Sequence, residues 1–245
     1  MFLAFAFSSL TAACAVDSTT DDLAGTTAED GALDDGKADL SGVYTYYAVQ
    51  PDLRKCAAPM CGGHFVSRVN LGTTKCNDGV YRASCYVADV DLSGLGLSES
   101  DLGKVTEMEG TFNQRLLLKG TIHSKWYGSV KVGVFKATEA WLGGTDSTPD
   151  GVFVKIHDNG VRCIAAPCAT TTEKKLNSSR TANIAGVDYS YSGASEREIE
   201  SLGDLMFTDG VIIAGDRYTV NENGRTAKGR TATQYWTRVV PAAAN

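Results

Sequence analysis

Proline and histidine are scarce in this chain of 245 residues, which has five prolines, three histidines and 26 glycines. So much glycine with so little proline suits a protein of short strands and turns better than a helical bundle. Three histidines limit any serine–histidine or cysteine–histidine dyad. The sequence has no Gly-x-Ser-x-Gly elbow, no His-Glu-x-x-His helix and no phosphate-binding glycine loop. We therefore predict a protein that is not an enzyme, with no catalytic, cofactor-binding or metal-binding residues.

A broad positive field is also missing. The formal net charge is −6, and residues 16–40 hold eight acids against one base, Lys37. The remainder of the chain is therefore close to neutral. Proteins that bind nucleic acids usually do so through a broad basic surface. We expect no nucleic-acid partner.

The apolar run at the N-terminus is short. About 13 apolar or small residues precede Cys14, whereas a helix that crosses the bilayer core needs about 20. A run of this length suits a signal peptide, which we assign to residues 1–15. Residues 16–41 are acidic and poor in apolar side chains, so they cannot offset their ordering entropy and should form a disordered tether.

Two interpretations of the export signal remain open. Ala12-Ala13-Cys14 resembles a bacterial lipobox, in which Cys14 is lipidated, although Thr11 stands where the lipobox usually has leucine. Ala13-Cys14-Ala15 instead fits a cleavage site for secretion. No lysine or arginine precedes the apolar run, although a signal peptide usually has one there, so the sequence leaves open where the natural protein starts. We expect a lipoprotein of the outer membrane or cell surface, or a periplasmic protein, with free secretion as the alternative; any membrane contact is through the lipid alone.

An internal repeat is the strongest signal in the sequence. Five blocks recur in one order, with offsets that shrink from 107 to 97 to 95 residues. They begin with the two Cys-x4-Cys segments and end with Ala137-Thr138-Glu139-Ala140-Trp141 and Ala232-Thr233-Gln234-Tyr235-Trp236. The repeat predicts two diverged β-rich domains, 42–143 and 152–240, with a linker at 144–151. The first domain has about ten extra residues around Cys76 and Cys85.

The seven cysteines fit an exported protein if Cys14 is set aside. Six then remain: Cys56, Cys61, Cys76, Cys85, Cys163 and Cys168. Six cysteines allow 15 pairings, but this local spacing favours three bridges between sequence neighbours. The alternative is a zinc site at Cys56, Cys61 and His64. The second domain has Thr171 where the first has His64, which favours disulfides.

Each domain follows the order β-β-β-α-β-β. In the first, the expected strands are 43–49, 64–71, 86–92, 115–126 and 131–141; in the second, they are 152–156, 171–176, 184–191, 210–220 and 226–239. Ser98 and Ser195 are N-cap signatures, each followed by an acid three residues later. This order predicts a mainly β protein of two tandem five-stranded barrels of the OB type, with small β-sandwiches as the alternative.

The motifs of this chain also resemble those of a known family. They are the duplicated arginine–cysteine start, the Cys-x-x-x-Pro-Cys turn, the later Val-Asp and the tether Asp35-Gly36-Lys37-Ala38-Asp39. They resemble an uncharacterised domain family found, often in two copies, in predicted lipoproteins of myxobacteria. The resemblance covers nearly the whole chain after the tether. It implies export and duplication and carries no known activity.

The remaining candidate residues have ordinary structural explanations. Asp91 and Asp188 recur at one place in the two domains and would be too far apart for paired-carboxylate catalysis. Trp141 and Trp236 correspond and should lie in the barrel cores, whereas Trp126 should be exposed. His123 and His157 should face solvent. Arg225, Lys228 and Arg230 form a basic turn, expected to be a solvated hairpin tip.

Three functions are therefore compared. The first is a non-enzymatic binding or structural protein whose partner is an extracellular protein or glycan. The second is an extracellular protease inhibitor that presents a cysteine-closed loop around Pro59 or Pro167, with Arg54 or Arg162 nearby. The third is an enzyme with a site at the domain junction, which a perturbed acidity at His64 or Asp91 would support. The sequence favours the first.

Overall fold

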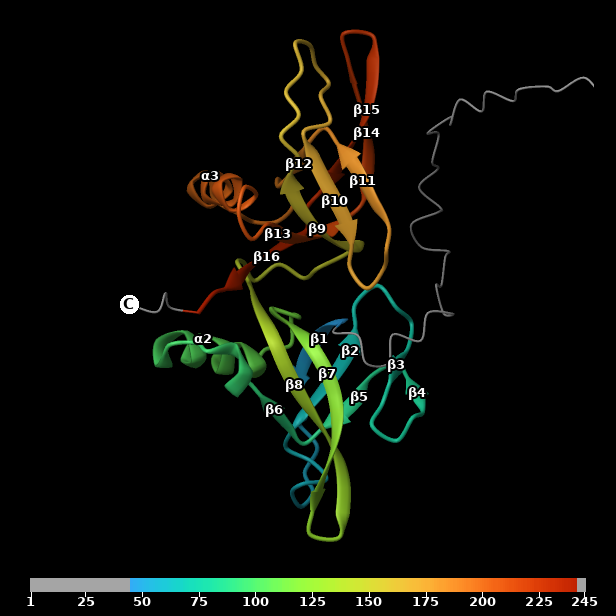
Figure 1. The fold of residues 1–245 in the computed structure, drawn as a ribbon, viewed down its shortest axis with the longest axis vertical. Helices are drawn as coiled ribbons and strands as arrows, with labels where there is room; N and C mark the ends of the chain where they lie inside the picture. Colours follow the sequence, from blue (N-terminus) through green and yellow to red (C-terminus); the bar gives the residue numbers. More distant parts are fainter. Residues whose placement is uncertain (1–44, 242–245) are drawn as a thin grey trace, which may run out of the picture.

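The computed structural model describes residues 45–241 and is mainly β, with two α-helices and mostly antiparallel strand pairs (Figure 1). The predicted signal peptide, the tether and Cys14 lie outside the described residues. Among residues 45–241, no helix is both long enough and apolar enough to cross a membrane. The chain is described below as a first half, residues 45–143, and a second half, residues 152–241.

The first half contains eight strands and one α-helix. Its main elements are β1 (Thr45–Pro51), β2 (His64–Arg68), β5 (Cys85–Val87), β6 (Asp89–Asp91), α2 (Glu99–Glu109), β7 (Leu116–Tyr127) and β8 (Val130–Gly143). The 3-10 helix η1 (Ser93–Leu95) precedes α2. A small hairpin of β3 (Thr74–Lys75) and β4 (Tyr81–Arg82) stands between β2 and β5.

The second half repeats this order without the small hairpin. It comprises β9 (Val152–Asp158), β10 (Thr171–Lys175), β11 (Thr181–Ile184), β12 (Val187–Asp188), α3 (Glu196–Leu205), β13 (Val211–Gly215), β14 (Arg217–Glu222), β15 (Arg225–Thr231) and β16 (Gln234–Val239). The predicted third strand is split in both halves, and the two closing strands of the second half are each split in two.

Both helices begin where the sequence predicts. The Ser98 side chain accepts a hydrogen bond from the Asp101 N–H at the start of α2. Ser195 accepts from the Glu198 N–H, and Glu198 in turn accepts from the Ser195 N–H, which completes a capping box at α3. These bonds satisfy backbone donors that have no partner within the helix.

One glycine bends the fourth strand at the same place in each half. The β7–β8 register is irregular between Lys119 and Gly120, and the second half breaks its strand after Gly215. A Cβ atom at Gly120 would collide with the Lys136 carbonyl oxygen, and one at Gly215 with that of Thr231. The bend requires this close backbone approach, so glycine is needed at both positions.

A single sheet runs through both halves in the order β11-β10-β9-β13-β16-β8-β7-β1-β2-β5, with β6 paired to β8 off this path. At its centre β16 and β8 pair antiparallel, Trp236 opposite Gly143 and Arg238 opposite Trp141. The strands of residues 45–241 form no closed barrel, so the predicted pair of five-stranded barrels of the OB type is not confirmed. The pairing of β8 with β16 joins the two halves. It is a long-range contact, which the sequence pattern of either half alone does not predict.

The buried side chains form three clusters. The first fills the first half around Val49, Phe135 and Leu118, and the third fills the second half around Ile156, Val211 and Leu202. The middle cluster takes residues from both halves: Ala48, Val69, Leu117, Trp141, Phe153, Leu176, Ile212, Ala214 and Trp236. Trp141 and Trp236 are fully buried, as expected, but in this shared core rather than inside separate barrels.

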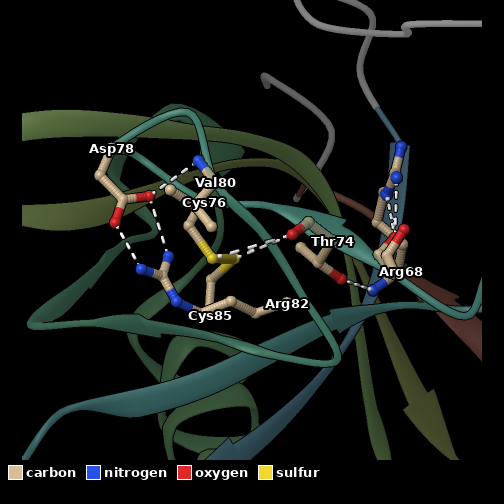
Figure 2. The surroundings of a disulfide bond; sticks show 8 residues. Arg68, Thr74, Cys76, Asp78, Val80, Arg82 and Cys85 are labelled. Carbon is tan, nitrogen blue, oxygen red and sulfur yellow. Dashed lines mark hydrogen bonds and ion pairs between the residues drawn. A yellow bond between two sulfur atoms is a disulfide. The ribbon is translucent and has the colours of Figure 1, made fainter.

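The three disulfides join sequence neighbours: Cys56 with Cys61, Cys76 with Cys85, and Cys163 with Cys168. Three bridges fit an exported protein. Figure 2 shows the Cys76–Cys85 bridge beside the Thr74 carbonyl oxygen, with Asp78 and Arg82 paired next to it. Both cysteines are buried in the first cluster, so this bridge fastens the β3–β4 hairpin to the core.

Candidate functional site

The outer face of β2 and β5 carries an aromatic pair. Phe65 and Tyr86 lie opposite each other in the strand register, with ring centroids 5.9 Å apart and planes at 65°. Their neighbours Val66, Cys85 and Val87 are buried in the core, and side chains alternate along a strand. Phe65 and Tyr86 therefore point away from the core.

Arg54 covers both rings. Its guanidinium carbon lies 5.0 Å from the Phe65 centroid and 4.9 Å from the Tyr86 centroid. Two Asp52 oxygens hold it in a bidentate ion pair, with N–O distances of 2.9 Å at each. Arg54 lowers the pKa of Asp52. The Asp52 side chain is buried, while 53% of the Arg54 side chain is exposed. Solvent therefore reaches the Arg54 guanidinium but not the Asp52 carboxylate.

The disulfide-closed loop after β1 is fixed against the same face. The Tyr86 hydroxyl donates to the Pro59 carbonyl at 2.9 Å, and Arg54 Nη2 donates to the Met60 carbonyl at 3.1 Å. The Cys56–Cys61 bridge closes the loop itself. Met60 and Leu53 are exposed on it.

The tip of the β7–β8 hairpin adds a second cation–aromatic pair. Lys125 Nζ lies 4.9 Å from the Tyr127 ring centroid. Burial raises the pKa of Tyr86, and Tyr127 is close enough to contribute to the same shift. Figure 1 shows this tip and the loop after β1 at one end of the molecule. We call Arg54, Phe65, Tyr86, Lys125 and Tyr127 the cation–aromatic surface. Trp126 is 64% exposed, as predicted, and alternation turns it to the other side of the hairpin.

The segments that form this surface are basic. Residues 51–68, 85–87 and 124–131 contain five bases (Arg54, Lys55, Arg68, Lys125, Lys131) and one acid, Asp52. Their formal charge is therefore +4, but strand alternation places Arg68 on the side of the buried Val66, and Lys131 lies opposite Trp126, so Arg54 and Lys125 are the bases stacked on the aromatic rings of the surface. Such a local concentration of positive charge attracts anions.

The second half lacks this surface. At the register position of Phe65 and Tyr86 it has Thr172 and Asn183, whose side chains share a hydrogen bond of 2.8 Å. The tip of the β14–β15 hairpin has Asn221 and Glu222 where the first half has Trp126 and Tyr127. The corresponding segments, 158–175, 182–184 and 219–226, hold four bases and three acids, a formal charge of +1.

His64 contacts Glu109 beneath the opposite face of β2. Nε2 of His64 lies 3.8 Å from Oε2 of Glu109, and both side chains are largely buried. Burial lowers the pKa of His64, whereas burial first and Asp89 second raise the pKa of Glu109 to about 7. Burial therefore drives each group toward its neutral form, and the contact is not a strong ion pair. His64 Nδ1 and Glu109 Oε1 are buried without a hydrogen-bond partner among the described residues.

The zinc alternative at His64 is contradicted, because Cys56 and Cys61 are joined in a disulfide and have no thiolate to offer. Within residues 45–241 no group of three or more His, Cys, Asp or Glu side chains could hold a metal ion.

A buried ion cluster occupies the core of the second half. Glu173 Oε2 accepts from Arg230 Nε at 2.5 Å, and its Oε1 accepts from Arg217 Nε at 2.6 Å. Arg230 is only 1% exposed and also donates to the Gly215 carbonyl. Arg230 is thus not part of a solvated hairpin tip, which corrects the sequence-based expectation; Arg225 is exposed and Lys228 is partly exposed. The first half has Val66, Ile122 and Phe135 at the matching positions.

The remaining candidates lie apart. Asp91 accepts from the Ser93 N–H and hydroxyl, and Asp188 accepts from the Ser190 N–H, so both stabilise turns. His123 is exposed beside Thr121, while His157 is half-buried, so the expectation that it faces solvent holds only in part. Arg162 pairs with Asp158 at 3.1 Å, next to the exposed Ile164. Both arginines proposed for a protease pocket are therefore engaged within their own loops.

The sequence missed the cation–aromatic surface and the Glu173 cluster. Phe65, Tyr86 and Arg54 are ordinary residues of a strand pattern, and only the strand register brings them together. The sequence did contain a sign of the Glu173 cluster, since the repeat aligns the charged Glu173 with the apolar Val66 of the first half.

These features define a mainly β protein with three disulfides among its described residues. The chain belongs to the DUF6748 family, a domain of unknown function, and one match to the family model covers residues 45–242, through both halves. No curated protein and no solved structure matches the chain.

Proposed function

We propose that this protein is an exported, non-enzymatic binding module that holds an extracellular glycan on the cation–aromatic surface of its first half. The observation that carries the proposal is the exposed Arg54 stacked on Phe65 and Tyr86, with Lys125 and Tyr127 alongside. The cations that lie over the rings offer hydrogen bonds to sugar hydroxyls, and the parts of the rings that they leave uncovered offer apolar surface to the sugar.

We further propose that the two halves are diverged copies of one OB-type barrel. In each half, strand one pairs with strands two and four, strand two with strand three, and strand five with strands four and three. The parallel β6–β8 and β12–β15 pairs supply the last of these contacts. OB folds are partly open barrels that bind oligosaccharides on strands two and three and on the loops after strands one and four. The cation–aromatic surface lies on those elements of the first half.

Export is the accompanying proposal. The three disulfides support an oxidising location, and the N-terminal apolar run supports a signal peptide. In this proposal Cys14 carries a lipid and the acidic segment holds the domain away from the envelope. The family model matches residues 45–242 as one copy, so the relation to lipoproteins rests on the sequence motifs alone.

A glycan fits the surface better than the two alternatives. A trypsin-type inhibitor needs a free arginine, whereas Asp52 and Asp158 hold Arg54 and Arg162. An enzyme at the junction needs free reactive groups there, whereas the core of the junction is apolar around Trp141 and Trp236, and the Glu139 carboxylate beside it is engaged by Lys119 and Tyr46. Neither arrangement supports catalysis or inhibition.

The test is binding of the purified chain to immobilised extracellular polysaccharides, compared with the variant Phe65→Ala/Tyr127→Ala. We expect this variant to lose at least tenfold in affinity. The matched control is Thr172→Ala/Glu222→Ala, which changes the corresponding positions of the second half and should bind as the natural chain does. Equal binding by both variants, with circular dichroism showing that both are folded, would overturn the proposal.

A further inference from the structure

We propose that the glycan bound by the cation–aromatic surface is anionic, with carboxylate, sulfate or phosphate groups that meet Arg54 and Lys125. This inference rests on the proposed function and adds the chemical class of the ligand.

The geometry of the two stacks supports an anion. Arg54 lies over Phe65 and Tyr86, and Lys125 lies over Tyr127, so a ligand that approaches the rings meets a cation first. A neutral sugar would need to move Arg54 away from Asp52, whose carboxylate is buried and holds it by two hydrogen bonds. An anionic group needs no such displacement, because it can bind the exposed side of the guanidinium.

Burial of the counter-charge strengthens this argument. Asp52 is the acid of the surface segments, and its side chain is covered by Arg54 itself. Arg54 therefore presents its charge to a ligand without an exposed acid beside it in those segments, whereas Lys125 is near Asp91 on β6, whose pKa is lowered by hydrogen bonding first and by Lys125 in smaller part. Arg54 is also held rigidly by the Met60 carbonyl and by both rings, so little conformational freedom is lost on binding.

The comparison between the halves is an independent observation. The two cations stacked on rings in the first half are Arg54 and Lys125, and the corresponding positions of the second half are the uncharged Val161 and Val220. The two halves share strand register and loop disulfides, so folding alone does not require this difference. Positive charge is concentrated where the aromatic residues are, as expected for one surface that selects an anionic chain.

The experiment compares polysaccharides that differ only in charge. The natural chain is titrated with polygalacturonate and with its fully methyl-esterified form, which has the same backbone without the carboxylates. Dextran sulfate and dextran form a second pair, and polyglutamate is a polyanion without sugar rings. We expect each anionic glycan to bind at least tenfold more tightly than its neutral partner and than polyglutamate, with an affinity that falls as salt is added.

A lysine variant tests the surface without disturbing the buried ion pair. Lys125→Ala should weaken binding of the anionic glycan about fivefold, the upper range for an exposed charge contact. Lys174→Ala removes an exposed lysine from the second half and should leave the affinity unchanged.

The outcomes separate the two proposals. If neutral and anionic glycans bind equally, the ligand is not selected by charge and this inference is wrong, while the proposed glycan function stands. If polyglutamate binds as tightly as polygalacturonate, the surface is a simple ion exchanger and both proposals fail. If no polysaccharide of either pair binds, both are likewise overturned.

Discussion

Asn70 and Asn177 bind each other's half of the molecule in the same way. Asn70 Nδ2 donates to the Phe153 and Leu176 carbonyls, and its Oδ1 accepts from the Phe153 N–H. Asn177 makes the matching bonds to Tyr46 and Val69 in the first half. Both asparagines have positive φ, 61° and 58°. Each ends the second strand of its own half and satisfies backbone groups of the first strand of the other.

Replacement of either asparagine by glycine should destabilise the whole structure. Glycine keeps the left-handed backbone without strain, so the change removes only the three side-chain hydrogen bonds. We expect Asn70→Gly and Asn177→Gly each to lower the free energy of unfolding by about 2 kcal/mol in urea titrations. The control is Asn223→Gly, which has a φ of 52° at an exposed hairpin tip and should be nearly neutral. Unequal effects at the two junction positions would contradict the reciprocal arrangement.

The Glu173 cluster should be replaceable by the apolar residues of the first half. Glu173→Val alone leaves Arg230 buried without its carboxylate and should cost about 3–5 kcal/mol. The triple variant Glu173→Val/Arg217→Ile/Arg230→Phe copies Val66, Ile122 and Phe135. We expect it to be as stable as the natural chain or more stable by about 1–4 kcal/mol. Thermal unfolding of both variants provides the measurement, and a triple variant weaker than the single one would refute the equivalence of the two cores.

Glu109 should make stability depend on pH near neutrality. Its pKa is raised to about 7 in the folded chain, against about 4.3 when unfolded. The folded state therefore holds the extra proton, so the contribution of Glu109 is complete below about pH 4 and is lost as the pH rises through about 7. Glu109→Gln, which is neutral throughout, should match the natural chain at about pH 4 and exceed it by roughly 3–4 kcal/mol at pH 8, since the two pKa values differ by about 2.7 and each unit is about 1.4 kcal/mol.

The difference between the two curves isolates Glu109, since His64 is present in both. Denaturant unfolding at several pH values is the measurement. If Glu109→Gln were less stable than the natural chain at pH 8, Glu109 would be a stabilising carboxylate paired with a charged His64.

The three disulfides should contribute unequally. Cys76 and Cys85 are buried in the core of the first half, whereas Cys163 lies exposed on a surface loop. Chain entropy alone gives about 2–3 kcal/mol for loops of this length. Removal of the buried bridge also leaves a cavity, so Cys76→Ala/Cys85→Ala should cost about 1 kcal/mol more than Cys163→Ala/Cys168→Ala. Equal midpoints in guanidinium unfolding would show that burial of the bridge adds nothing.

The elements of this fold could be predicted from the sequence because their signals are local. The strands follow β-branched and aromatic runs, and Ser98 and Ser195 mark the helix starts within one residue. The β8–β16 joint could not be predicted, since it depends on which strand edges remain free after each half has folded. Trp141 and Trp236 illustrate this, because an apolar pattern predicts that a side chain is buried but not which residues it packs against.

The candidate site was predicted only in part. The sequence indicated the disulfide loop, because cysteine spacing can be read directly from it. It also predicted that Trp126 is exposed, but that side chain lies on the other side of the hairpin, outside the site. The contact of Arg54 with Phe65 and Tyr86 depends on register and on a loop that folds back, which spacing does not specify. The prediction that Arg230 is exposed was wrong for a related reason. A turn rich in basic residues is normally exposed to solvent, and the buried acid that binds Arg230, Glu173, is 57 residues away in the sequence.

The antiparallel joint of β8 and β16 lies on one continuous chain, linked by residues 144–151. Two separate subunits joined by the same edges would part on dilution, since their association depends on concentration. Here the link fixes a high effective concentration of each half for the other. The shared tryptophan core therefore persists at any dilution.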